Sequence, residues 1–246
     1  MSFKSKVAAA AAAVTLVGGF GAVAASTATS AGAATPSCGN TCINIFSKLF
    51  GTQRHPNFVM DVWRQAAKVN QPIILFRASL SDPAEDFNAS LQGFVSDFAS
   101  AGLVSPQVAL HYGAGAAGFP DDPAFELEYT PYGVGSGLCV GVFSTAAQGT
   151  KVSLQPCGVT SKTVWIVDTL DTTLAGGFVP LINGSDGNFS HPFVLTYPAN
   201  GYPTDSPRPQ LTVTELTGFT GSFLVPVLGT VDDNQMWSAT IGVLHS

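Results

Sequence analysis

Residues 138–165 read LCVGVFSTAAQGTKVSLQPCGVTSKTVW, and this stretch contains the pattern that decides the fold. Two apolar runs flank a polar loop around Gly149, and a turn then leads to an aromatic residue, Trp165. Short apolar runs bounded by turn residues are typical of β-strands that pair as hairpins. The stretch is therefore predicted to form a two-stranded hairpin followed by a further strand.

The same order of runs occurs twice more along the chain. Residues 58–87, FVMDVWRQAAKVNQPIILFRASLSDPAEDF, repeat it with similar internal distances. Residues 193–216, FVLTYPANGYPTDSPRPQLTVTEL, begin it again and reach their aromatic late, at Trp237. Each unit is preceded by another apolar run: CINIFSKLF, AFELEYTPY and GGFVPLI. Because these runs do not alternate with helical segments, the pattern predicts three units of four short strands and no parallel α/β sheet.

A four-stranded unit of this size cannot bury its own apolar face, so the three units must pack together. Closure into one barrel, capped by the hairpins, buries that face and removes exposed strand edges. The composition agrees, because 46% of the 246 residues are hydrophobic, only 11% are charged, and 26 Gly and 16 Pro supply turns. We therefore expect one all-β domain.

The unit resembles the ricin-type β-trefoil lectin repeat, which runs from Cys-hydrophobic-Asp-Val through a Gly-containing loop and a hydrophobic-polar-Leu-aromatic-Pro-Cys run to Gln-x-Trp. CVGV, VSLQPC and Trp165 match the second repeat, and NQMW supplies Gln235 and Trp237 in the third. MDV, IILF and a degenerate EDF match the first. The resemblance implies a β-trefoil with Trp165 and Trp237 in its core and Gln235 hydrogen-bonded to the backbone of its own repeat.

The resemblance begins at about Cys42 and implies repeats at about residues 42–91, 124–170 and 176–246, within one domain at 35–246. An insertion at about residues 91–124 separates the first two repeats and is longer than a trefoil requires. Either it extends one hairpin beyond the barrel or it forms a loop that contacts a partner, since long insertions are often functional. An interaction or inhibitor protein that uses the trefoil only as a scaffold is therefore the alternative function.

The resemblance also implies a sugar site. In the family, an Asp after the first hairpin strand accepts hydrogen bonds from two sugar hydroxyls, and an aromatic residue of the second strand stacks on the sugar ring. A polar residue near Gln-x-Trp adds further bonds. Asp61, Phe76 and Glu85 match these three positions in the first repeat. A carboxylate is a strong acceptor and a ring face covers sugar C–H groups, so these residue types suit the task.

The other repeats differ at the acid and ring positions, which hold Gly141 and Gln155 in the second repeat and Thr196 and Thr214 in the third. The first repeat is therefore the predicted sugar site. It also departs from the family, because Ile74 occupies a position that is often polar and Glu85 begins EDF in place of Gln-x-Trp. The alternative interpretation makes Asp61 a hairpin-turn acid and Phe76 a core ring.

The first 34 residues have the pattern of a secretory signal peptide. Lys4 and Lys6 precede the apolar run VAAAAAAVTLVGGFGAV, and an Ala-x-Ala cleavage motif follows at residues 31–33. A membrane anchor is the competing interpretation, because the run is nearly long enough to span a bilayer. No basic cluster follows the run, so we expect cleavage and an extracellular protein without a membrane span.

The charge of the chain argues against two classes of partner. Without Lys4 and Lys6, eight of the ten basic residues remain against sixteen acidic ones, and no Lys/Arg cluster occurs. Nucleic acids and anionic membranes are therefore not expected as partners. We expect a monomer that binds a carbohydrate or, in the alternative function, a protein.

The four cysteines fall into two pairs. Cys139 and Cys157 belong to two neighbouring strand-like runs, while Cys38 and Cys42 enclose a short loop in CGNTC. Paired strands can bring two cysteines within disulfide reach, and an oxidising compartment preserves the bond. Zinc is the alternative, but the chain has no CxxC motif and no His at ligand spacing. Two disulfides and no metal are predicted.

No catalytic set of residues stands out. GAGAAG at residues 113–118 matches G-x-G-x-x-G, but Pro120 and Pro123 prevent the helix that a dinucleotide site requires. GVGSG is not a nucleophile elbow, and the acids of DDPAFELE lack the spacing of an EF-hand calcium loop. We predict a protein without enzymatic activity and without a cofactor.

Overall fold

The computed structural model describes residues 43–52, 55–79, 82–114, 121–167, 177–222, 225–228 and 231–241. The predicted signal peptide at 1–34 and the predicted pair Cys38 and Cys42 lie outside the described residues. Within the described ranges, no helix is long and apolar enough to cross a membrane.

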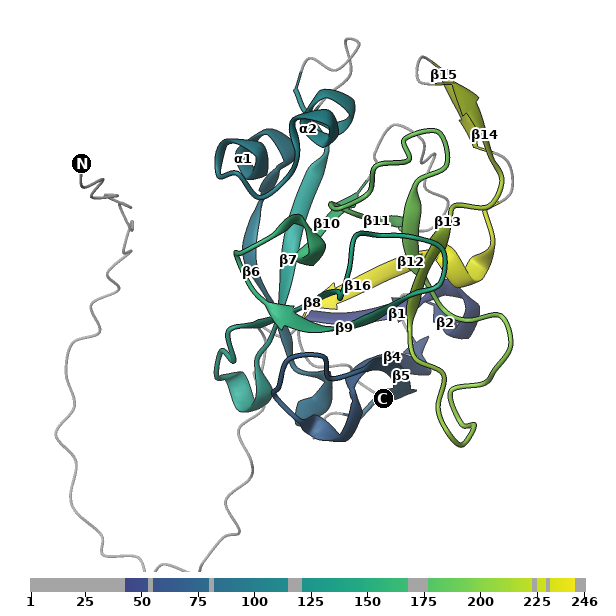
Figure 1. Ribbon diagram of the computed structural model, residues 1–246. Coiled ribbons are helices and arrows are strands. Elements are labelled where there is room, and N and C mark those ends of the chain that lie inside the picture. The colour runs from purple at the N-terminus through teal and green to yellow at the C-terminus, as the bar shows by residue number, and fades with distance from the viewer. Residues whose placement is uncertain are drawn as a thin grey trace, which may run out of the picture. The chain divides into compact units, whose positions relative to one another are not determined.

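Six strands of the described chain, two from each repeat, form a closed barrel (Figure 1). They are β1 (Ile43–Ser47), β6 (Phe87–Phe94), β7 (Pro123–Tyr129), β10 (Val164–Val167), β11 (Leu181–Asn183) and β16 (Trp237–Ile241). From β1 to β11, each pairs antiparallel with the next in this order. The ring closes because β16 pairs with β1 and Val179, just before β11, bridges to Trp237. A closed ring leaves no barrel strand with a free edge.

Three hairpins cap one end of this barrel. They are β4 (Phe58–Val62) with β5 (Ile73–Arg77), β8 (Leu138–Val142) with β9 (Thr150–Pro156), and β12 (Phe193–Thr196) with β13 (Thr212–Glu215). Each hairpin contacts the other two, because β13 pairs with β9 and two bridges, Pro72 to Ser153 and Ile74 to Gln210, join the first hairpin to its neighbours. Six barrel strands and three hairpins make a β-trefoil, as predicted.

The closing aromatic residues fill the barrel core. Trp165 and Trp237 are fully buried, and their indole N–H groups donate to the carbonyl oxygens of Val140 and Leu195 at 2.9 and 2.7 Å. A buried indole requires such an acceptor, and here the hairpin of the same repeat supplies it. Phe87 occupies the equivalent place in the first repeat and is also buried. The prediction that both tryptophans belong to the core is confirmed.

A disulfide joins Cys139 of β8 to Cys157, the residue after β9. It therefore fastens the second hairpin at its open end, as predicted from the spacing of the two cysteines. Because both sulfur atoms are used in this bond, the two cysteines are not zinc ligands.

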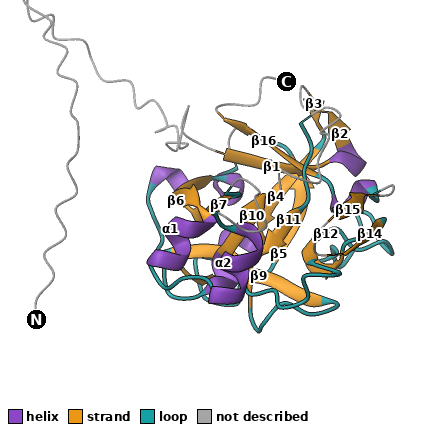
Figure 2. Ribbon diagram, turned by 90° about the horizontal axis from the view of Figure 1, so that it is seen from above, coloured by secondary structure: helices purple, strands orange, loops and turns teal. Residues whose placement is uncertain are grey.

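The insertion contains an extended hairpin and two short helices. Strands β6 and β7 pair from Phe87 opposite Tyr129 to Phe94 opposite Pro123, with a bulge after Ala89. Beyond that point lie α1 (Val95–Ser100) and α2 (Pro106–Tyr112), which Figure 2 shows beside these strands. Each helix is too short to produce a recognisable apolar stripe in the sequence, so neither was predicted.

The helices have a core of their own. Apolar side chains of the insertion pack against residues of the barrel strands in one buried cluster that includes Val95, Phe98, Val108, Ala124, Val164 and Ile182. The insertion is therefore anchored to the outside of the barrel. Two further small hairpins, β2 (Gly51–Thr52) with β3 (His55–Pro56) and β14 (Phe219–Ser222) with β15 (Val225–Leu228), extend from the first and third repeats.

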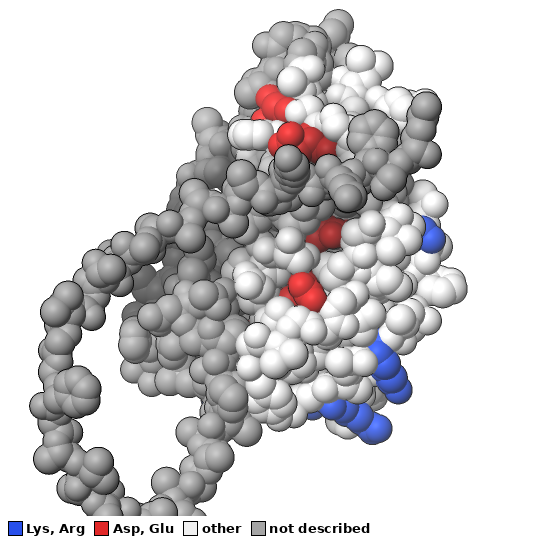
Figure 3. Space-filling model, turned by 90° about the vertical axis from the view of Figure 1, so that its left-hand side faces the viewer, with Lys and Arg blue, Asp and Glu red and all other residues white. Residues whose placement is uncertain are grey.

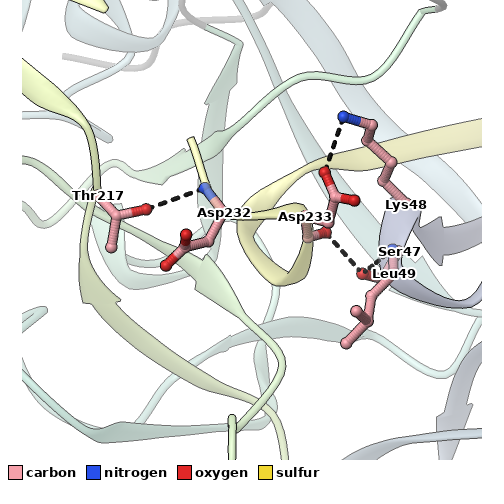
Figure 4. A network of polar contacts seen from close by, with 6 residues as sticks. All are labelled: Ser47, Lys48, Leu49, Thr217, Asp232 and Asp233. Atoms are coloured by element: carbon pink, nitrogen blue, oxygen red, sulfur yellow. Dashed lines mark hydrogen bonds and ion pairs between the residues drawn. The ribbon is translucent and has the colours of Figure 1, made fainter. Parts of the chain in front are cut away.

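Polar contacts join the first repeat to the last (Figure 4). The Ser47 hydroxyl donates to the Asp233 carbonyl at 3.2 Å, and the Lys48 ammonium pairs with the Asp233 carboxylate at 2.7 Å. Beside them the Asp232 N–H donates to the Thr217 hydroxyl at 3.0 Å. These contacts support the place where β1 meets β16 and complete the barrel.

Candidate functional site

The strand pairing confirms which positions are equivalent in the three hairpins. Asp61 lies opposite Ile74, as Gly141 lies opposite Ser153 and Thr196 opposite Thr212. The ring position two residues further along the second strand holds Phe76, Gln155 or Thr214. The register is therefore the same in each hairpin, and the side chains at these positions distinguish the first repeat from the others.

An open cavity of about 360 Å³ lies on the first repeat. It is lined by Asp61, Trp63, Arg64, Gln65, Ile74, Phe76, Asp82, Ala84 and Arg208. Asp61 and Phe76, the predicted acceptor and the predicted stacking ring, thus belong to one cavity. Glu85, the third predicted residue, does not line it and is only 3% exposed.

Asp61 is only 4% exposed, and no hydrogen bond between described residues involves its carboxylate. The pKa of Asp61 is raised to about 8, chiefly by burial and also by the negative charge of Asp82, while the positive charge of Arg208 opposes the rise. The carboxyl group is therefore mostly protonated at neutral pH. A hydroxyl donor or a cation beside it would favour the ionised form.

Glu85 stands where the third repeat has Gln235. Its Oε2 accepts from the Ser79 N–H at 2.9 Å, as Oε1 of Gln235 accepts from the Thr217 N–H at 2.7 Å. The other oxygen of Glu85, Oε1, is buried and has no partner among the described residues. The pKa of Glu85 is raised to about 9, chiefly by burial, with the Ser79 N–H opposing the rise and the charges of neighbouring acids including Asp61 adding to it.

In Gln235 the corresponding atom is the amide nitrogen Nε2, and it is hydrogen-bonded. Its amide nitrogen donates to the Glu215 carbonyl at 2.7 Å and to the Thr214 hydroxyl at 2.9 Å. The prediction that Gln235 bonds to the backbone of its own repeat is confirmed. The third repeat is thus internally satisfied where the first has an unpaired carboxyl oxygen.

Asp82 lines the cavity and is held in place by hydrogen bonds. It caps the short 3-10 turn Pro83–Glu85, and its Oδ1 accepts from the Ala84 N–H at 3.0 Å and from the Gln65 side chain at 2.8 Å. The carboxylates of Asp82, Asp61 and Glu85 each have an oxygen within 4.8 Å of the others. One acid of β4 and two acids of the same short turn therefore lie close together.

Most residues of the cavity were not foreseen from the sequence, among them Trp63 and Arg208. Trp63 follows Asp61 by two positions, and Arg208 comes from the long connection between β12 and β13 of the third repeat. The Arg208 guanidinium lies 4.3 Å from the Phe76 ring centroid and 5.7 Å from that of Trp63. A guanidinium stacks readily on a ring, so Arg208 covers the ring that was predicted to face the sugar.

The backbone is strained at the rim of the cavity. Arg64 and Gln65 have φ angles of 59° and 56°, in the left-handed region that non-glycine residues seldom adopt. Each such residue costs of the order of 1–3 kcal/mol, and strain of this kind collects at functional sites. The Arg64 guanidinium also lies 5.5 Å from the Trp63 ring centroid.

No protein-family model matches this chain, and no curated protein sequence matches it. Among solved structures, the chain is similar to ThreeFoil, a designed threefold-symmetric protein. The likeness has a TM-score of 0.47 and 14% sequence identity, and it covers 80% of this chain and 96% of ThreeFoil. The assignment to the β-trefoil fold follows from the strand order and the three hairpins described above.

Proposed function

We propose that this is a secreted, non-enzymatic protein that binds a carbohydrate in the cavity of the first repeat. The observation that carries the proposal is the composition of that cavity, which combines acidic acceptors, basic and amide donors, and aromatic rings. A sugar presents hydroxyls that both donate and accept, together with apolar C–H faces. A cavity of mixed polar groups and rings is complementary to both features.

Each lining residue has a role in this proposal. Asp61 and Asp82 accept hydrogen bonds from sugar hydroxyls, and Arg64 and Gln65 donate to them. Trp63, half-buried at the rim, packs against the sugar C–H groups. Phe76 contacts the ligand only where Arg208 moves off its ring, because the guanidinium now covers it.

The other two repeats are closed to the same role. A Cβ atom at Gly141 would lie 2.7 Å from the Lys162 carbonyl oxygen, so an acid cannot replace this glycine without moving the backbone. In the third repeat the Thr196 hydroxyl donates to the Val194 carbonyl at 2.9 Å. The same hydroxyl lies 2.8 Å from the hydroxyl of Thr214. Binding is therefore expected at one site per chain.

Secretion is supported by the amino-terminal sequence and by the disulfide of the second repeat, since disulfides persist in oxidising compartments. Charged side chains are also sparse on the described part of the face drawn in Figure 3, where most residues are neither basic (blue) nor acidic (red). That surface suits a neutral ligand better than a polyanion.

A second candidate function uses the insertion, which would bind a protein while the trefoil serves as scaffold. It is favoured by three large apolar side chains that the insertion exposes: Leu91, Phe94 and Leu110. Leu110 is 67% exposed. Phe94 also borders an open, mainly apolar cavity of about 410 Å³ between the extended hairpin and the strands β1 and β16.

A glycan array probed with the exported protein tests the proposal. We expect the parent and Asp232→Asn to bind the same glycans, and Asp61→Asn to bind them at least tenfold more weakly. Asp232 is a matched control because it is an exposed acid outside the cavity. Equal binding by Asp61→Asn would place the site elsewhere. Absence of binding by the folded parent would favour the insertion as the functional surface.

The same array identifies the stacking ring. Trp63→Leu and Phe76→Leu each keep apolar volume but remove the aromatic face. We expect Trp63→Leu to weaken binding more, because Phe76 lies beneath Arg208. A larger loss with Phe76→Leu would show that Arg208 moves aside when the ligand binds.

A further inference from the structure

We infer that Asp61, Asp82 and Glu85 bind a divalent cation of the calcium type. The three residues come from the end of β4, from the residue before a 3-10 turn and from the end of that turn. One carboxylate oxygen of each lies within 4.8 Å of the other two. Their spacing in the sequence matches no calcium-loop pattern, so only the fold reveals the group.

The hydrogen bonds of the acids leave oxygens free to act as ligands. One oxygen of Asp82 is held by the Ala84 N–H, and one oxygen of Glu85 is held by the Ser79 N–H. These bonds fix the orientation of the two carboxylates in the manner of outer-shell contacts at metal sites. The second oxygens of both residues and the two oxygens of Asp61 make no hydrogen bond with a described residue.

Two buried polar atoms beside the acids point to a missing ligand. Oε1 of Glu85 is buried without a partner among the described residues, although the Glu85 carboxylate has an oxygen within 4.8 Å of Asp61 and Asp82. The hydroxyl of Tyr129, which lies opposite Phe87 in the pairing of β6 with β7, is likewise buried and unpartnered within the described chain. Buried polar atoms normally have partners, so an ion or its bound water accounts for both.

The charge of the group leads to the same inference. Buried carboxylates are usually paired with a cation or bound to a metal. Among the described residues, the ion pair within 4.0 Å is Lys48 with Asp233, and it involves none of the three acids. Arg208 lines the same cavity, but its guanidinium is packed on Phe76.

The ligand set favours calcium over other divalent ions. It contains only oxygens, which hard cations prefer and which give no advantage to zinc or copper. Ca²⁺ binds six to eight oxygens at about 2.3–2.6 Å in a flexible geometry, whereas Mg²⁺ requires about 2.1 Å and a near-ideal octahedron. A set of carboxylates that was not arranged as an octahedron therefore favours Ca²⁺, and the remaining positions are left to water.

Calcium titration of the chelator-treated, full-length protein tests the inference. We expect heat for one Ca²⁺ per chain, a rise in Tm of several degrees, and Mg²⁺ binding at least tenfold weaker than Ca²⁺. Terbium, used as a calcium probe, should show emission sensitised by the nearby Trp63. No heat, no Tm shift and no terbium emission would overturn the inference, and Mg²⁺ binding as tight as Ca²⁺ binding would overturn the choice of ion.

Variants separate a built site from weak surface binding. Glu85→Gln is the sharpest, because the third repeat already accommodates Gln235 at the equivalent position and the variant is expected to fold. We expect at least tenfold weaker Ca²⁺ binding for Glu85→Gln and Asp61→Asn, and none of this loss for Asp232→Asn. An unchanged affinity in folded Glu85→Gln would contradict the site. The titration contains no sugar, so its result is independent of the proposed function.

Discussion

The hairpins of the first and third repeats have the same register, but their buried polar side chains differ: the third repeat has an amide and hydroxyls where the first has carboxyl groups. In the third, Gln235 and three threonines satisfy one another and the backbone. In the first, Asp61 and Glu85 occupy corresponding places, and Oε1 of Glu85 is buried and unpaired among the described residues. Unpaired buried groups destabilise a fold unless something binds them. The difference therefore separates a repeat that stabilises the barrel from the repeat for which we propose a ligand.

Gln235→Leu should produce the largest loss of stability. The substitution leaves the Glu215 carbonyl and the Thr217 N–H without their partner, along with nearby threonine hydroxyls. Each buried group left unpaired costs about 1–3 kcal/mol, so we expect the free energy of unfolding to fall by roughly 3–5 kcal/mol. Urea unfolding followed by tryptophan fluorescence measures it. A loss below about 1 kcal/mol would show that the network of the third repeat is not structural.

The second repeat relies on its disulfide in place of such a network. Closing a loop of this length stabilises a protein by roughly 3 kcal/mol, so Cys139→Ser combined with Cys157→Ser should lower the free energy of unfolding by about that amount. Calorimetry of the double variant tests the expectation. The parent measured in a reducing agent is the control and should unfold at a similar temperature. A double variant as stable as the oxidised parent would contradict it.

Glu85→Gln should stabilise the chelator-treated protein by roughly 1–3 kcal/mol at pH 8. Glu85 in the parent has a pKa raised from 4.5 in the unfolded chain to about 9 in the fold. The parent therefore keeps the full contribution of this group below pH 4.5 and loses stability as the pH rises toward 9. Glutamine does not titrate, so the advantage of the variant should grow with pH.

Unfolding in urea at pH 5 and pH 8, with a chelator present, measures this trend. Asp232→Asn serves as the control, because it removes an exposed acid and should show the pH dependence of the parent. An advantage of Glu85→Gln that shrinks as the pH rises would contradict the raised pKa.

Lys48→Ala should have the smallest effect. The side chains of Lys48 and Asp233 are 40% and 52% exposed, and exposed ion pairs contribute about 0–1 kcal/mol. We expect a loss below about 0.5 kcal/mol that disappears at high salt. Unfolding at two salt concentrations tests this. A larger loss that salt abolishes would mean that the junction of the first and third repeats depends on this pair more than on the Ser47 hydroxyl, and a loss that salt leaves unchanged would not come from the ion pair.

The sequence predicted the features that depend on local pattern. The hairpin strands, the buried Trp165 and Trp237, and the disulfide follow from apolar periodicity and motif spacing, which repeat three times. Asp61 and Phe76 share a cavity because the hairpin register fixes both. Local pattern is a good guide wherever neighbours in sequence are also neighbours in the fold.

The remaining site residues depend on contacts between repeats, which a single sequence does not contain. Arg208 reaches Phe76 because the bridge between Gln210 and Ile74 places the third repeat against the first. Asp82 joins Asp61 only when its turn folds beneath β4. Trp63 carried a signal, since it is an aromatic residue two positions after the predicted acceptor, but it was not recognised.

The pairing of β1 with β16 has a consequence for how the chain is made. Ile43 to Ser47 find almost all of their strand partners in residues 237–241, and only Ile43 also pairs with Phe87. The edge of β1 therefore stays unpaired until β16 has been synthesised. Unpaired strand edges can pair with other chains. Such a barrel cannot close until nearly the whole chain has been synthesised, which agrees with the secretion proposed above.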